Sequence, residues 1–132
     1  MLNPKKNKRF SFIPTYKTVQ EIITDQNLAT LGDAYTNLIY SLYLSTKTRE
    51  PTGAKANSHI LSKALKQARL RRFLPSRTDR HKQADAAEAL LVYAWLQGLT
   101  AIKENVNMMI KYKDATEAFS SLLSDAKKKL DL

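Results

Sequence analysis

The stretch from Asp85 to Leu96 limits the possible folds more than any other part of the chain, because it is apolar on nearly every side. Its sequence, DAAEALLVYAWL, contains no Pro or Gly and consists mostly of residues with good helix propensity. A helix without a polar face is usually buried. We therefore expect this segment to run through the core of a helical protein and to end at Gly98.

Two carboxylates stand at the start of this apolar stretch, Asp85 and Glu88. Their spacing places them side by side on a helix. Burial of two like charges is costly unless something compensates them. The sequence leaves three explanations open: pairing with a basic side chain, retention of a proton by one carboxyl, or a hard metal ion bound between them.

A second helix is predicted from Leu28 to about Ser45. Its apolar residues recur at helical spacing, and they are Leu28, Leu31, Tyr35, Leu38, Ile39 and Leu42. Gly32 inside this helix costs about 1 kcal/mol relative to Ala, which indicates the close approach of another helix. If Gly32 packs against the Ala-rich start of the first helix, Asp33 comes near both of its carboxylates. Three carboxylates on adjoining helices could bind Mg²⁺ or Mn²⁺ through oxygen.

These two segments resemble the signature helices of the ribonuclease III nuclease domain. They are residues 28–38 (LATLGDAYTNL) and residues 85–98 (DAAEALLVYAWLQG). The first family signature has Leu-Gly-Asp followed by a small residue, and the second has Asp-x-x-Glu-Ala-Leu followed by an apolar run. The order and rough separation of the two motifs match, and the resemblance extends from about Tyr16 to the C-terminus.

The resemblance implies a metal-dependent endoribonuclease that hydrolyses phosphodiester bonds of double-stranded or structured RNA. Asp33, Asp85 and Glu88 match positions that bind the catalytic Mg²⁺ or Mn²⁺, with Asp33 and Glu88 as catalytic residues. The family also implies a homodimer in which each subunit cuts one strand. Ala29 stands where many members have a further metal-binding Glu, a departure shared with the short members called Mini-III. Thr30 replaces an aromatic residue that, in many members, plugs into the partner subunit.

The chain carries a net charge of +10, and most of the excess lies between Lys47 and Lys82. Eleven basic residues in this stretch are opposed only by Glu50 and Asp79, which leaves a local charge of +9. Concentrated positive charge suits a polyanion, because phosphate contacts release counterions. The plainer alternative is a solvated surface that promotes solubility. The residues that we expect to contact RNA are Lys55, Lys63, Lys66, Arg69, Arg71, Arg72, Arg77, Arg80 and Lys82.

No segment shows the alternation typical of a strand, so the expected fold is all-α with five to seven helices. Thr18 and Glu21 form a plausible capping box for a short helix. The remaining helices are predicted after Asn57 or Ser58, at residues 100–112 and at residues 115–130. Residues 1–14 are expected to form a flexible basic arm, and residues 15–132 a single nuclease domain.

The 132 residues contain no Cys, which excludes disulfides, zinc–thiolate sites and cysteine nucleophiles. No apolar run reaches about 18 residues and no signal-peptide pattern is present, so we expect a cytoplasmic protein without membrane contact. Two other classes of function stay open. One is a catalytically silent ribonuclease III-like protein that grips structured RNA, for example ribosomal RNA, which Ala29 and the lack of room for a separate RNA-binding domain favour. The other is a helical DNA-binding protein, supported by charge alone.

Overall fold

The computed structural model describes residues 10–132, and within them it contains six α-helices, one short 3₁₀ helix and no β-strand. These elements are α2 (Val19–Ile23), α3 (Gln26–Thr48), α4 (Ser58–Gln67), η1 (Arg71–Phe73), α5 (Arg80–Leu96), α6 (Ile102–Met109) and α7 (Ala115–Leu130). The expected all-α class is confirmed. The basic arm expected at residues 1–14 lies mostly outside the described residues.

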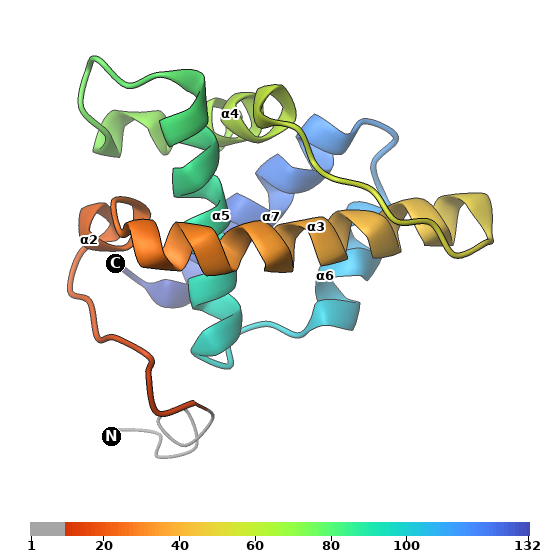
Figure 1. Ribbon diagram of the computed structural model, residues 1–132, viewed down its shortest axis with the longest axis horizontal. Helices are drawn as coiled ribbons and strands as arrows, with labels where there is room; N and C mark the ends of the chain where they lie inside the picture. Colours follow the sequence, from red (N-terminus) through yellow and green to blue (C-terminus); the bar gives the residue numbers. More distant parts are fainter. Residues whose placement is uncertain (1–9) are drawn as a thin grey trace.

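Helix α5 stands at the centre of the fold, crossed by α3 and packed against α2, α4 and α7 (Figure 1). Every residue from Ala86 to Ala94 is buried, as the all-round apolar sequence predicts. Burial on all sides is possible because neighbouring helices cover each face of α5. The central helix therefore fixes the positions of the helices around it, and α3 with them.

The beginning of α5 differs from our expectation. The helix starts at Arg80, and the side chain of its N-cap residue Asp79 accepts a hydrogen bond from the Lys82 N–H at 2.9 Å. Polar residues thus extend the helix by more than a turn before the apolar run begins. Asp85 and Glu88 therefore do not lie in the first turn of the helix, although they stand at the start of its apolar run. The positive end of the helix dipole lies too far away to explain either carboxylate.

Helix α3 lies along the surface, so only the side that faces the other helices is covered. Leu28, Tyr35 and Ile39 are buried, whereas Leu31 and Leu38 are 40% and 47% exposed. The apolar residues that recur at helical spacing are therefore not all buried, and these two lie on the outer side of the helix. The exposed leucines leave an apolar strip on the outer side of α3.

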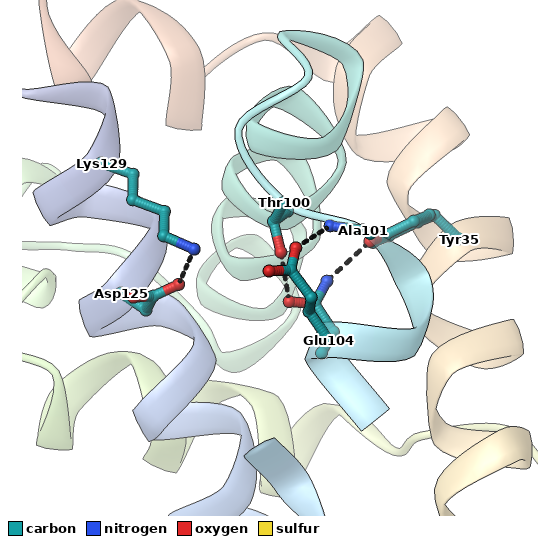
Figure 2. Close-up of polar contacts among 7 residues, drawn as sticks. Tyr35, Thr100, Ala101, Glu104, Asp125 and Lys129 are labelled. Atoms are coloured by element: carbon teal, nitrogen blue, oxygen red, sulfur yellow. Dashed lines mark hydrogen bonds and ion pairs between the residues drawn. The ribbon is translucent and has the colours of Figure 1, made fainter. Parts of the chain in front are cut away.

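Aromatic stacking and a buried polar chain hold the distal part of α5 and the start of α6 against α3. The ring of Tyr35 stacks on that of Trp95 with a centroid distance of 5.2 Å. The Tyr35 hydroxyl accepts a hydrogen bond from Asn105 Nδ2 at 2.8 Å, and Asn105 Oδ1 accepts one from Thr100 Oγ1 at 2.7 Å (Figure 2). Buried polar groups that are fully paired favour one arrangement over others. These contacts therefore support the crossing angle of α3 and α5.

The described part of the N-terminal segment lies against the same end of α5. The Tyr93 hydroxyl donates a hydrogen bond to the Pro14 carbonyl at 3.0 Å, and the Phe10 ring lies 6.0 Å from that of Trp95. The segment thus contacts the helix through Phe10 and Pro14. Across residues 10–132, no helix combines the length and apolar character that crossing a bilayer requires.

Candidate active site

Helices α3 and α5 touch backbone to backbone at Gly32. A Cβ atom on Gly32 would lie 2.2 Å from the carbonyl oxygen of Glu88 and 2.5 Å from its carbonyl carbon. Any side chain at this position would force the helices apart. The close approach predicted from a glycine inside a helix is confirmed, and it brings the next residue, Asp33, to the same side of α5.

Asp33, Asp85 and Glu88 line one cavity of about 330 Å³. The structure therefore gathers at one place the three carboxylates that we expected to lie together. The other residues that line this cavity are Gln26, Ala29, Thr30, Lys55, Ala56, Ser58, Leu61, His81 and Ala84. The cavity is bounded by α3, by the beginnings of α4 and α5, and by the segment that joins α3 to α4.

Glu88 is the most strongly perturbed of the three carboxyls, and only 5% of it is exposed. Burial raises its pKa to about 8, and a hydrogen bond with Asp33 and the charges of Asp33 and Asp85 act in the same direction. The ammonium group of Lys55 lowers the pKa in opposition. At neutral pH these influences favour a protonated Glu88 as long as no cation is bound beside it.

The pKa of Asp85 is also raised, first by burial and then by the charges of Asp33 and Asp79. His81 and a hydrogen bond from the Gln26 side chain partly offset this rise. Within residues 10–132, no lysine, arginine or histidine nitrogen lies within salt-bridge distance of Asp85. The same is true of Glu88, so pairing with a basic side chain does not account for these two carboxylates.

Asp33 is partly exposed and makes two polar contacts at the cavity. Its Oδ1 accepts a hydrogen bond from Asn37 Nδ2 at 3.3 Å, its Oδ2 lies 3.9 Å from Lys55 Nζ, and its side chain is 47% exposed. As the side chains stand, no three His, Cys, Asp or Glu residues in the described part of the chain could together hold a metal ion. The donor set suits a hard cation because all its atoms are carboxylate oxygens.

The basic residues expected to contact RNA are, except for the half-buried Arg71, all exposed. Lys55 lines the cavity, and Arg80 donates from Nε to Oγ of the lining residue Ser58 at 2.9 Å. Lys63 and Lys66 lie on the exposed side of α4. Arg69 follows that helix in the left-handed conformation, with φ of 62°.

Four further basic residues lie in or beside the connection between α4 and α5. Arg71 donates to the carbonyls of Leu74 and Ser76 at 3.4 and 2.8 Å, so its guanidinium group holds the connection together. Arg72 covers the Phe73 ring at 4.8 Å. Arg77 and Lys82 line a second cavity, of about 270 Å³.

Sequence reasoning did not single out Gln26 or Asn37. Asn37 lies four residues after Asp33, a spacing at which helical side chains meet, and this spacing could have identified it. Gln26 left no comparable signal, because its contact with Asp85 exists only once α3 has crossed α5.

The family model described as Ribonuclease III matches residues 26–131, which span α3 to α7 and most of the chain. The search of curated proteins found no significant match.

Proposed function

The chain belongs to the ribonuclease III family, and from this premise we propose that it is a metal-dependent endoribonuclease acting on double-stranded or structured RNA. The observation that carries the proposal is the shared cavity of Asp33, Asp85 and Glu88. Two of these carboxylates have no basic partner among the described residues. A cluster of like charges with this little compensation is costly for a fold to keep, and such clusters are typical of functional sites.

Asp33, Asp85 and Glu88 would hold Mg²⁺ or Mn²⁺, which when bound activates water and offsets the negative charge that develops on the phosphodiester. Asp33 and Glu88 are the proposed catalytic residues. Glu88 would keep its proton while no cation is bound and would lose it on becoming a metal ligand. Lys55, which lines the cavity, would contact a phosphate of the RNA strand.

The exposed basic residues, Lys55 among them, would hold the RNA by its phosphates. A-form RNA is recognised mainly by its shape, its phosphates and its 2′-hydroxyl groups, so a charged surface without base-reading side chains fits such a substrate. The proposed contacts are Lys55, Lys63, Lys66, Arg69, Arg72, Arg77, Arg80 and Lys82, which are all exposed. Arg71 is also among the residues expected from the sequence to contact RNA, but its guanidinium group donates hydrogen bonds to backbone carbonyls and so also stabilises the connection between α4 and α5.

We propose that the protein is a homodimer and that the strip around Leu31 and Leu38 on α3 forms part of its interface. These residues are 40% and 47% exposed and lie about two turns apart on one side of the helix, and exposed apolar residues grouped on a surface favour association. A symmetric pair would place two carboxylate sites on one particle. Each site would then act on one strand of a duplex.

A catalytically silent RNA-binding protein is the second candidate. Ala29 lines the cavity without contributing an oxygen ligand, and the carboxylates do not form a closed cluster as they stand. A protein with such a site would still bind RNA through its basic surface but would not hydrolyse it.

One assay distinguishes the two candidates. Long duplex RNA is incubated with the protein in Mg²⁺, in Mn²⁺ or in EDTA, beside Glu88→Gln, Asp33→Asn and the control Glu50→Gln, whose residue lies in an exposed loop. We expect metal-dependent products with 5′-phosphate ends from the native protein and the control, and none from the two site variants. Retention of RNA by all four proteins with no cleavage in either metal would support the silent alternative.

A further inference from the structure

The segment between α3 and α4 turns back and runs beside α3 (Figure 1), where a row of polar side chains holds it. Ser45 Oγ accepts from the Thr52 N–H at 2.8 Å and donates to the Thr52 carbonyl at 3.1 Å. Ser41 Oγ makes the same pair of bonds with Ala54, at 2.9 and 3.0 Å. We call Asn37, Ser41 and Ser45 the α3 ladder.

The spacing of the ladder explains why it can hold an extended segment. Residues four apart on a helix are about 6 Å apart along its axis, and alternate residues of an extended chain are separated by about 6.6 Å. Successive turns of α3 therefore meet every second residue of the segment. The side chains supply the partners that its backbone groups would otherwise find in a neighbouring strand.

Asn37 is the last member of the ladder and differs from the two serines. Its Oδ1 accepts from the Ala56 N–H at 2.9 Å, while its Nδ2 donates to Asp33 Oδ1 at 3.3 Å. The residue before Ala56 is Lys55, whose Nζ lies 3.9 Å from the other oxygen of Asp33. The two ends of one amide group thus touch the carboxylate of the cavity and the segment that carries a cavity lysine.

We propose that Asn37 is a positioning residue that couples the metal-binding carboxylate Asp33 to the segment carrying Lys55, an inference that rests on the nuclease function proposed above. Its Nδ2 limits the rotation of the partly exposed Asp33 side chain. Its Oδ1 keeps Ala56, and with it Lys55, at the edge of the same cavity. The site that holds the cation and the group that meets the phosphate are in this way set relative to each other.

The variant Asn37→Ser distinguishes the positioning of Asp33 from the attachment of the segment to α3. A serine here can accept from the Ala56 N–H and donate to the Ala56 carbonyl, as Ser41 does with Ala54. Its single hydroxyl proton is then not available to Asp33. The matched control is Ser41→Ala, which removes two hydrogen bonds from the same segment without touching Asp33. Mn²⁺ affinity is measured by calorimetry without RNA, RNA affinity is measured in EDTA, and kcat and KM follow from cleavage.

We expect Asn37→Ser to bind Mn²⁺ about tenfold more weakly, as removal of a partner of a metal ligand commonly does, to lower kcat and to keep its RNA affinity. Ser41→Ala should show the reverse pattern, with weaker RNA binding, a higher KM and native Mn²⁺ affinity. Native Mn²⁺ affinity and kcat in Asn37→Ser would overturn the inference while leaving the nuclease function in place. A native protein that neither binds Mn²⁺ nor cleaves RNA would overturn the proposed function, and the coupling with it.

Discussion

Gly32 lies so close to Glu88 that the backbones of α3 and α5 are in direct contact. A Cβ on the glycine would stand 2.2 Å from the Glu88 carbonyl oxygen. The neighbouring residue Asp33 reaches the carboxylates of α5 because of this contact. One missing side chain therefore determines both the packing of the central helices and the composition of the cavity.

Gly32→Ala should destabilise the protein, because the methyl group has no space and its nearest neighbours are backbone atoms. We expect a loss of at least about 2–3 kcal/mol in the free energy of unfolding, measured by urea denaturation. Gly53→Ala is the control, since a Cβ there would have no atom within 4 Å. It should change stability by less than about 1 kcal/mol. Equal effects of the two substitutions would contradict the contact.

Glu88→Gln should stabilise the folded protein at alkaline pH. The folded-state pKa of about 8 exceeds the ordinary value of 4.5, so between these values the folded chain holds a proton that the unfolded chain has lost. The free energy of unfolding therefore falls as pH rises through this window, and the penalty is complete above pH 8. The amide variant has no such penalty and should be more stable by about 1–2 kcal/mol at pH 9.

Urea unfolding of both proteins at pH 5 and pH 9 measures this difference. Glu50→Gln, an exposed position, should follow the native protein at both pH values. A Glu88→Gln variant that is less stable than the native protein at pH 9 would show that the buried carboxylate is compensated by contacts other than those described.

The same proton should make Mg²⁺ binding depend on pH. A cation competes with the proton of Glu88, whose pKa is raised to about 8, so we expect affinity to rise with pH up to about 8 and then to level off. Calorimetry in buffers of different ionisation enthalpy would detect the proton released on binding. Affinity that stays constant between pH 6.5 and 8.5 would exclude Glu88 as a ligand.

Much of this arrangement could be predicted from the sequence, because local rules determine it. The apolar run of α5, the interior glycine of α3 and the N-cap Asn57 each carry a pattern that tertiary structure did not override. The start of α5 was missed because Arg80 and the polar residues after it have no apolar period. Exposed Leu31 could not be distinguished from a core residue, since a helix pattern does not reveal which side its neighbours cover.

The contacts within the site were harder to foresee than the helices. Proximity of Asp33 to the α5 carboxylates followed from one glycine and a row of alanines. The bonds of Asn37 and Gln26 depend on where a loop and a second helix arrive after folding. Such long-range contacts produce no periodic pattern in the sequence from which they could be predicted.

Leu38→Lys should separate the proposed dimer into monomers, because it places a charge within the exposed apolar strip of α3. Light scattering at micromolar concentration measures the mass, and we expect it to be halved. Ile110→Lys is the control, since this residue is 40% exposed at the end of α6. A native protein that is already monomeric, or a dimer that survives Leu38→Lys, would exclude this interface.

Lys66→Ala and Arg71→Ala should differ in what they impair. Lys66 is exposed on α4, and the loss of one phosphate contact should weaken RNA binding uniformly and reduce the slope of log affinity against log salt by about 1. Arg71 bonds to the backbone of residues 74 and 76, so its removal should lower the free energy of unfolding by about 1 kcal/mol or more. Fluorescence anisotropy across a salt series and urea unfolding measure the two effects.

Trp95 is the sole tryptophan of the sequence, and its indole rests on the ring of Tyr35, two residues beyond Asp33. Emission excited at the red edge of its absorption therefore comes from one spot in the molecule, where the two signature helices meet. Any ligand, pH change or substitution that separates these helices should change the wavelength and the intensity of the tryptophan emission. The fluorescence of Trp95 therefore reports on the contact between α3 and α5 on which the proposed chemistry depends.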